Sequence, residues 1–446
     1  MNGRRAQIAV IGLLVAHGLT FSGFSQSTAK DLSKEDALEL ALIQNFGIQL
    51  AQKKAQSAGV NTGWGAAGAL PQIGVTATVS NMVSDQSENP TSFIQEKLES
   101  ESLNATAQFN WTIFDGMRMF ANKQALDVMA EQAEGQLYLV IEQTVVAVLG
   151  AYDEVLIQRA METVLRNSLT VSAERLIRLE TAQEFGGART FDRLQIQNSL
   201  FTDSLALIQQ GLARETALQN FNRLLGVEES ERWRLTSELE EPKTPDSWET
   251  LKSGILNDAT AIRNALLSYE LASVGLEQAQ GGLYPTLQVS SNVGDQRSVF
   301  AAGDLSGAGR TLNLAANLTL NFNVFNGGAT RRAIQQAKIE IEVAALDFAD
   351  QQNQMVVFAR TAVDRMNAQE SMYGLAVRMA DNARSLLTMG MDRLEFGAIN
   401  SLDFRELQLS VQRAEMEVLR TQQGWGSAHL DLKRLQGFWG GGIDNE

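Results

Sequence analysis

The chain has 446 residues, a formal net charge of −15 and no cysteine. The acidic balance argues against a nucleic-acid partner, because phosphate binding needs clustered Lys and Arg. The absence of Cys excludes disulfides and thiolate chemistry. With only His17 and His429, histidine-based catalytic and metal sites are disfavoured as well, so we expect a protein that is not an enzyme and that holds no cofactor and no metal.

Residues 1–25 have the character of a secretory signal peptide. Arg4 and Arg5 precede an apolar stretch from Ile8 to Val15, and Gly23 and Ser25 have the small-residue spacing of a cleavage site. No later stretch contains about 18 unbroken apolar residues, so no transmembrane helix is expected. The exported chain is then either soluble outside the cytoplasm or held in a membrane as a β-barrel.

The rest of the chain contains two copies of one unit. Residues 103–226 align without a gap on residues 314–437, at a constant offset of 211 (314 − 103), and further upstream Pro71 aligns on Pro285 at an offset of 214 (285 − 71). Each copy has the pattern of a helix, two strands, a long helix and a return helix. We therefore predict repeat 1 at 26–226, a linker or equatorial segment at 227–246, repeat 2 at 247–437 and a C-terminal tail at 438–446.

Alternation of apolar and polar residues predicts two strands in each repeat. They are expected at about 71–83 and 103–114 in repeat 1, and at about 285–294 and 311–325 in repeat 2. A soluble sheet packed on a core would show the same alternation. An uncharged polar face of Thr, Asn and Gln favours an outer-membrane β-barrel instead, as do Trp111, Tyr284 and Phe322, which we predict to be membrane-interface aromatic residues.

Four strands cannot close a barrel by themselves. An open sheet in lipid would leave backbone groups unpaired, at several kcal/mol each, so protomers must share one barrel. Two chains would give eight strands, whose interior is filled by side chains, whereas three chains would give twelve strands and a lumen. The Asn-rich polar faces favour the larger barrel.

Long helices account for most of the remaining sequence. Apolar residues recur every three or four positions over about 116–184 and about 327–395, which predicts helices of about 70 residues and roughly 105 Å. Return helices are expected at about 187–226 and 398–437. The segment from Asp36 to Gly68 is half as long as a long helix, so stacked end to end with a return helix it would match one. A fibrous coiled coil explains the helices but leaves the strands unexplained.

The junctions between helices and strands carry distinctive residues. Pro71 and Pro285 lie where a helix gives way to a strand, a position that suits a ring without an N–H. The opposite junctions are Phe114-Asp115-Gly116 and Phe325-Asn326-Gly327, which suit a tight turn and a helix N-cap.

These features together resemble the TolC family of outer-membrane efflux proteins: the duplication, the prolines before strands, the Phe-Asp/Asn-Gly turns after them, and paired Gly-x5-Asp turns. The likeness covers nearly all of the mature chain. It implies an α+β membrane protein, a homotrimer with a single twelve-stranded β-barrel in the cell outer membrane and a long α-helical barrel in the periplasm, closed at its far end. It also implies a channel that docks on a periplasmic adaptor (membrane fusion) protein and an inner-membrane transporter, and gives their substrates a passive exit.

The Gly-x5-Asp turns join each long helix to its return helix, Gly186 to Asp192 and Gly397 to Asp403. Their role could be local, with Gly ending one helix and Asp capping the next. Glu406 lies three residues after Asp403, however, so both carboxylates share one helix face. The resemblance matches Asp403 and Glu406 to the acidic rings of the family's constriction, and Asp192 to an acidic position in the turn of the first repeat. Rings of Asp and Glu favour cations. We therefore predict that these three acids form a gate.

At the positions where the family has a basic and an aromatic latch, this chain has Ile399 and Leu394. Arg189 and Arg393 are the candidates to replace them. Two other classes stay open on the sequence, namely a structural coiled-coil envelope protein or adhesin, and an envelope hydrolase that uses paired acids. The hydrolase lacks a recognisable pocket near its acids.

Overall fold

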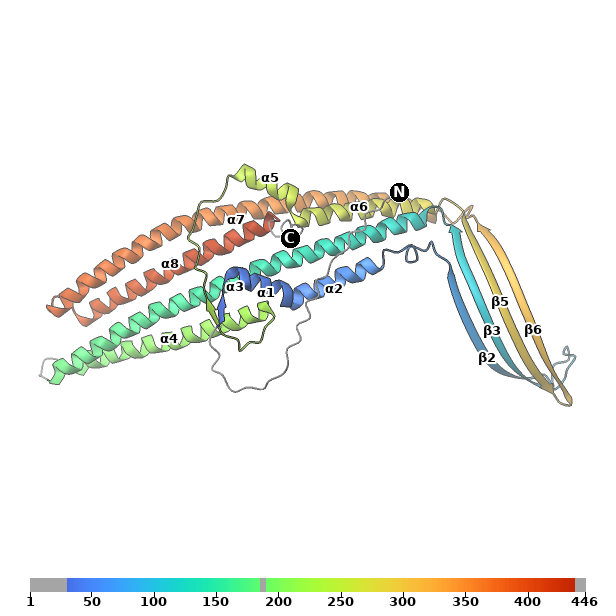
Figure 1. Ribbon diagram of the computed structural model, residues 1–446, viewed down its shortest axis with the longest axis horizontal. Coiled ribbons are helices and arrows are strands. Elements are labelled where there is room, and N and C mark those ends of the chain that lie inside the picture. Colours follow the sequence, from blue (N-terminus) through green and yellow to red (C-terminus); the bar gives the residue numbers. More distant parts are fainter. Residues whose placement is uncertain (1–29, 185–189, 438–446) are drawn as a thin grey trace.

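The computed structural model describes residues 30–184 and 190–437. The predicted signal peptide, Gly186, Arg189 and the tail from 438 lie outside them. The molecule is elongated: a long bundle of helices ends in a separate four-stranded sheet (Figure 1). The first repeat comprises β1 (Lys30–Leu32), α1 (Lys34–Gln44), α2 (Phe46–Val60), β2 (Gln72–Asp85), β3 (Lys97–Phe114), α3 (Arg118–Glu184) and α4 (Thr190–Leu225). The second half comprises β4 (Trp233–Leu235), α5 (Trp248–Asp258), α6 (Thr260–Gly281), β5 (Thr286–Ala302), β6 (Leu305–Asn321), α7 (Ala329–Glu395) and α8 (Ser401–Leu435).

The large sheet has the strand order β2-β3-β5-β6, and every pair in it is antiparallel. Its register places Val75, Ala107, Val293 and Leu314 in one cross-strand row on one face, and Thr76, Thr106, Gly294 and Asn313 in a row on the other. The apolar face is not covered by other elements, since Val75 is 77% and Leu314 75% exposed. The sheet therefore differs from a soluble sheet, which packs its apolar face on a core.

The strands run further than the alternation predicts. β3 begins at Lys97 rather than near 103, and β5 ends at Ala302 rather than near 294. The apolar side of the pattern stops where Glu99, Glu101 and Asp295 replace apolar residues, but backbone pairing does not depend on side-chain polarity and continues. At its other end β6 is shorter than predicted, because it stops at Asn321 instead of 325.

The N-terminal helical segment, expected from about Asp36 to Gly68, consists of two helices that are separated at Asn45, and the second of them ends at Val60. The Asn45 side chain accepts hydrogen bonds from the N–H groups of Gly47 and Ile48 and donates one to the carbonyl of Leu224 at 2.7 Å. The break therefore receives the end of α4, which lies end to end with α2. Gly226 follows that end with φ +78°, and a Cβ there would lie 2.3 Å from the carbonyl oxygen of Gln44.

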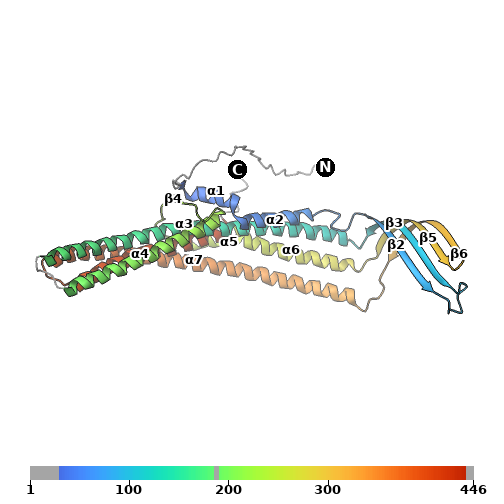
Figure 2. The same cartoon turned by 90° about the horizontal axis from the view of Figure 1, so that it is seen from below.

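The second repeat has the same arrangement. α5 and α6 are separated by Ala259, and Gly437, at the end of α8, has φ +68° and would place a Cβ 2.5 Å from the carbonyl oxygen of Asp258. At both sites only glycine fits, because its left-handed backbone also approaches a neighbouring backbone closely. The stalk is thus two long helices, each flanked by a pair of shorter helices stacked end to end (Figure 2).

The core of the stalk lies near its middle. In the first repeat Tyr152 and Phe221 are fully buried with Leu225, and the two rings meet edge to face with centroids 5.8 Å apart. In the second repeat Trp425 and Ile255 occupy a corresponding cluster. Nearer the far end, Ala380, Ala383 and Ala414 pack together, and small residues there let α7 and α8 approach closely.

The linker, residues 227–246, forms a belt around the middle of the stalk. Its strand β4 pairs in parallel with β1, and its Ser237 N–H donates to the Tyr152 hydroxyl, which itself donates to the carbonyl of Leu32. Further along, Trp425 donates to the carbonyl of Lys243 at 3.1 Å. The belt therefore joins helices of both repeats. Across residues 30–184 and 190–437, none of the helices is both long enough and apolar enough to cross a membrane.

Candidate gate at the tip of the helical stalk

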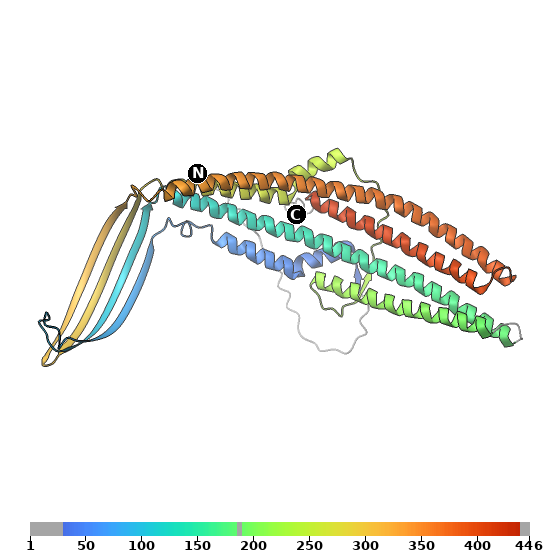
Figure 3. The same cartoon turned by 180° about the vertical axis from the view of Figure 1, so that it is seen from behind.

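The end of the stalk farthest from the sheet is built from two helical hairpins, α3–α4 and α7–α8 (Figure 3). In the second hairpin Gly397 has φ +67°. Its N–H donates to the carbonyl of Leu394, and the next N–H, of Ala398, donates to the carbonyl of Arg393 at 2.7 Å. These two hydrogen bonds make up the Schellman motif, so Gly397 ends α7 as expected for a left-handed glycine.

Asp403 does not cap α8, and the capping interpretation is wrong for this residue. The N-cap is Asn400, whose Oδ1 accepts hydrogen bonds from the N–H groups of Leu402 at 2.8 Å and Asp403 at 2.9 Å. Asp403 is the third residue of the helix, and its carboxylate is exposed. A carboxylate in a first helical turn is stabilised by the helix dipole and stays available to solvent.

The three predicted gate acids lie on different hairpins. Asp403 and Glu406 are exposed one turn apart on α8, and Glu406 lies 3.4 Å from the guanidinium of Arg413, with both side chains more than two-thirds exposed. Asp192 is half-buried in the first turn of α4. Asp192 thus belongs to the α3–α4 hairpin, whereas Asp403 and Glu406 belong to the α7–α8 hairpin. A single chain therefore brings together two of the three.

A buried polar cluster, not anticipated from the sequence, lies beside these acids. Asp203 of α4 accepts two hydrogen bonds from Arg405 of α8, at 2.6 and 2.8 Å, and a third from the hydroxyl of Ser172 on α3 at 2.6 Å. The Asp203 side chain is 5% exposed and that of Arg405 13%. The pair is thus bidentate and largely removed from water.

Two further sets of contacts join α8 to α3 here. Gln408 donates to the carbonyl of Ser168 at 2.7 Å and lies 2.9 Å from the Ser172 hydroxyl. Arg175 donates to the hydroxyl of Ser401 at 2.7 Å, and its guanidinium lies 4.5 Å from the centre of the Phe404 ring. Burial, and then the positive charge of Arg405, lower the pKa of Arg175 to about 10. We call Ser168, Ser172, Asp203, Arg405 and Gln408 the Asp203 cluster.

The Asp203 cluster ties the first turns of α8 to α3 and α4, which belong to the other repeat. Arg405 is two residues from Asp403, whereas Asp203 is eleven residues from Asp192 (203 − 192), about 16 Å along a helix. The offset of 211 pairs Ser172 with Ala383 and Asp203 with Ala414, and both alanines are buried. A polar pair in one repeat that matches two alanines in the other is the sequence signal that could have revealed the cluster.

The junction residues lie at the opposite end of the stalk, next to the sheet. Pro71 and Pro285 directly precede β2 and β5. Gly116 has φ +75°, and a Cβ there would lie 2.3 Å from the carbonyl oxygen of Gly281. Gly327 also has a left-handed backbone, at φ +64°, and the N-cap of α7 is Gly328, which has no side-chain cap bond. In this repeat, therefore, glycines rather than Asn326 make the helix start.

The aromatic residues near these junctions are exposed. Trp111 is 38% exposed and donates from its indole N–H to the carbonyl of Ala69 at 3.0 Å. Phe114 ends β3 beside an irregularity in the register, and Phe325 is exposed beyond the end of β6. Tyr284 and Phe322 are each more than half exposed. They form an exposed aromatic border on the stalk side of the sheet.

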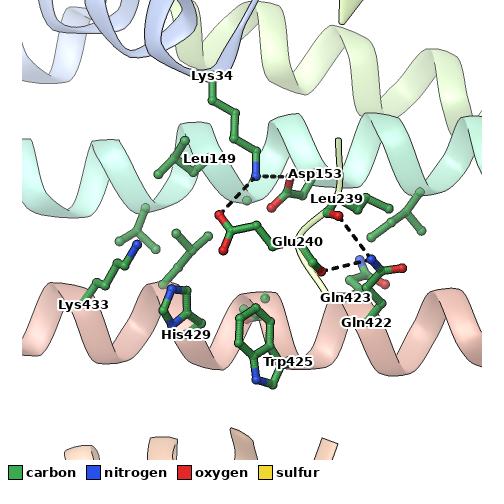
Figure 4. A pocket seen from close by; sticks show the side chains of 16 residues that line it. Lys34, Leu149, Asp153, Leu239, Glu240, Gln422, Gln423, Trp425, His429 and Lys433 are labelled. Atoms are coloured by element: carbon green, nitrogen blue, oxygen red, sulfur yellow. Dashed lines mark hydrogen bonds and ion pairs between the residues drawn. The ribbon is translucent and has the colours of Figure 1, made fainter. Parts of the chain in front are cut away.

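A cavity of about 210 Å³ lies near the belt, between α3, α8 and residues 239–240 (Figure 4). Lys34 approaches Asp153 to 2.9 Å there and Glu240 to 4.0 Å. Burial raises the pKa of Asp153 and lowers that of His429, whose ring stacks on Trp425. Among the residues that the structure describes, no group of three or more His, Asp and Glu side chains is placed to hold a metal.

Comparison with known proteins identifies the family of this chain. Residues 37–227 and 251–438 match the family described as outer membrane efflux protein. The chain belongs to the outer membrane efflux protein family. Outer membrane protein TolC of Escherichia coli (strain K12) is 21% identical over 441 residues, which cover 94% of this chain and 85% of TolC.

Solved channels show the same fold. The CmeC outer membrane channel of Campylobacter jejuni aligns with a TM-score of 0.73 at 15% identity, over 96% of this chain and 94% of CmeC. The open state of the MtrE outer membrane channel of Neisseria gonorrhoeae aligns with a TM-score of 0.69 at 15% identity, over 93% of each chain. This family member is an outer-membrane efflux channel whose helical part lies in the periplasm. The predicted fold class and location are confirmed.

Proposed function

We propose that three copies of this chain form one channel, which offers a passive exit to substrates delivered by an inner-membrane transporter and a periplasmic adaptor protein. The observation that carries the proposal is the state of the sheet. Both of its faces are largely exposed, and its two edges, β2 and β6, have no strand partner within the described chain. In a membrane such edges must be paired, because lipid offers no hydrogen bonds.

Pairing β6 of one copy with β2 of the next satisfies both edges and continues the order β2-β3-β5-β6 around a ring. Three copies give twelve strands, which leaves a lumen, whereas eight strands would be filled by side chains. The face with Thr76, Asn104, Asn292 and Asn313 would line that lumen. Its polar and uncharged side chains suit a wet passage.

The helical stalk supplies the remaining parts of the duct. Each long helix has 67 residues, which is about 100 Å at 1.5 Å per residue, enough to carry the passage well away from the membrane. Membership of the efflux family supports the proposal that the stalk docks on an adaptor and a transporter. The two helical hairpins at its tip are the surface nearest to such partners.

The gate is proposed at this tip. Threefold symmetry would present Asp403 and Glu406 three times around one axis, giving six carboxylates, and Asp192 would add a further level closer to the tip. Rings of carboxylates attract cations and repel one another. The closed tip therefore needs cohesive contacts elsewhere, and the Asp203 cluster beside Asp403 is such a contact.

Two measurements test the proposal. Light scattering and circular dichroism in detergent should show a trimer with a strand component, and a stable monomer in the absence of detergent would favour the coiled-coil alternative. In planar bilayers, the wild-type channel should be cation-selective, and Asp403→Ala plus Glu406→Ala should remove most of that selectivity. The matched control is Glu228→Ala plus Glu229→Ala, which deletes two charges in the belt. Equal selectivity in both double variants and the wild type would remove the acids from the gate.

A further inference from the structure

One face of the sheet carries a row of opposed arginines where the apolar side chains end. We call the face with Val75, Ala107, Val293 and Leu314 the outward face, since it meets lipid if the proposed trimer holds. Cross-strand partners share a face, and Arg297 is the direct partner of Arg310. Leu103 and Val79 complete the same row. Both guanidinium groups therefore project from the face that carries the apolar band, at the border where charged residues begin.

The distance of this arginine row from the stalk side of the sheet matches the thickness of a membrane. On β6, the outward positions between Phe322 and Arg310 are all apolar: Leu320, Leu318, Ala316, Leu314 and Leu312. Twelve residues (322 − 310) span about 40 Å of strand, and a tilt of about 40° reduces this to roughly 30 Å. That is the thickness of the hydrocarbon core. With Phe322 at the stalk-side interface, Arg310 lies at the head-group level of the outer side.

Asp295 holds the two arginines but neutralises only one of them. Its carboxylate lies 2.9 and 3.1 Å from Arg310 and 3.1 Å from Arg297. Like charges directly opposite in a sheet are unfavourable unless something compensates them. The trio carries one net positive charge, and the arginine side chains are 58% and 63% exposed. Within the part of the chain that the structure describes, Arg297 uses only Nη2 on Asp295.

The acidic residues nearby restrict where an anion could lie. Glu101 is one row further out, opposite Val299, and Glu99 is two rows out and paired with Lys97 at 2.8 Å. An anion bound farther from the stalk than the arginine row would be repelled by these carboxylates. At the arginine row itself, both guanidinium groups are more than half exposed, so a lipid head group can approach them from the side.

We propose that Arg297 and Arg310 bind the phosphate of an anionic lipid head group in the outer leaflet around the channel. Guanidinium forks match phosphate oxygens with two parallel hydrogen bonds, and their weak hydration suits an interface. Lipid is favoured over free phosphate because the site sits at the border of the lipid-facing band. Each copy of the trimer carries one such site, which fixes the height of the barrel in the membrane.

The test uses the full-length trimer in detergent and compares two probes, diphosphorylated lipid A and the same lipid after removal of its phosphates. Native mass spectrometry and the shift in melting temperature report binding. The wild type should bind the phosphorylated lipid at least tenfold more tightly than the dephosphorylated one. Arg297→Gln plus Arg310→Gln should abolish that preference, whereas Lys97→Gln, which removes one charge from the same face, should retain it. Arg297→Lys plus Arg310→Lys should give an intermediate preference, because charge is kept without the fork.

Three results would overturn the site: equal binding of the two lipids by the wild type, an unchanged preference in the glutamine double variant, or competition by inorganic phosphate at equal concentration. If the double variant does not assemble, the two-lipid comparison on the wild type and Arg297→Gln alone decides. Conductance is measured on the same samples, because the inference rests on the proposed channel. If the wild type is a conducting trimer but shows no preference between the two lipids, the lipid site alone is contradicted. If the wild type forms no trimer and does not conduct, the proposed channel is contradicted.

Discussion

Replacing Asp203 by Ala should loosen the tip of the stalk. The Asp203 and Arg405 side chains are only 5% and 13% exposed, and removal of one partner of a buried ion pair costs about 3 to 5 kcal/mol. Arg175 is the second guanidinium of this region, and burial and then the charge of Arg405 already lower its pKa. The variant would therefore leave the buried guanidinium of Arg405 without its carboxylate and with Arg175 nearby, and we expect a loss of at least about 3 kcal/mol for this contact.

We expect that free energy to stabilise the closed state of the proposed gate. The contact joins α8 to α3 and α4, and its loss of about 3 kcal/mol shifts a closed–open equilibrium by roughly 100-fold toward the open state. In planar bilayers, Asp203→Ala channels should spend more time in high-conductance states. Amide hydrogen exchange in the first two turns of α8 should become faster by a similar factor.

Two further variants sharpen this experiment. Arg413→Ala removes the exposed pair with Glu406 and should change stability by at most about 1 kcal/mol. A triple variant, Ser172→Ala, Asp203→Ala and Arg405→Leu, should restore slow exchange. The positions of the second repeat that match Ser172 and Asp203 are already packed alanines, and Arg405 matches Leu194 of the first repeat. If Asp203→Ala and Arg413→Ala channels conduct and exchange alike, the cluster does not hold the tip closed.

Two predictions concern the middle of the stalk. Gly226→Ala should destabilise the protein by about 1 to 3 kcal/mol in a thermal unfolding assay, because φ is +78° and the new Cβ would lie 2.3 Å from the carbonyl oxygen of Gln44. In the same assay the control Gly59→Ala, in open space on α2, should stabilise the protein slightly. Equal effects of the two variants would contradict the close approach at Gly226. Burial raises the pKa of Glu142 above its ordinary 4.5, against a hydrogen bond from Thr260. A raised acid pKa means that the native state holds the proton more tightly, so stability is lost as pH rises from 4.5 through the raised value. Glu142→Gln should therefore raise the melting temperature more at pH 8 than at pH 5, and an equal gain at both would count against this assignment.

Tertiary structure decided the contacts that hold the two repeats together. Arg405 and Asp203 are 202 residues apart, and Asn45 and Leu224 are 179 apart. Whether two such side chains lie in contact depends on the axial position of one helix relative to the other. A hydrophobic period of 3.6 residues identifies the buried face of each helix but gives no information about that axial position. The sequence therefore indicated the exposed acids of α8 and missed the buried carboxylate beside them.

The strand ends were likewise decided by pairing. β3 and β5 continue through Glu101, Asp295 and Arg297, although the apolar alternation stops there, because the hydrogen bonds that define the strands belong to the backbone. This extension is what places Arg297 opposite Arg310. The break at Asn45 was missed for a related reason, because it is stabilised by a contact with the end of α4, which is far away in the sequence.

By itself, the sequence determined the architecture: a duplicated unit, two-faced strands, very long helices and a composition that disfavours nucleic-acid binding and histidine-based catalysis. These properties follow from periods of 2 and 3.6 residues and from the match between the repeats, all of which are local or one-dimensional. The partners of buried polar groups, the breaks in helices and the full length of the strands depend on segments far apart in the chain. Only the folded arrangement brings those segments to within hydrogen-bonding distance.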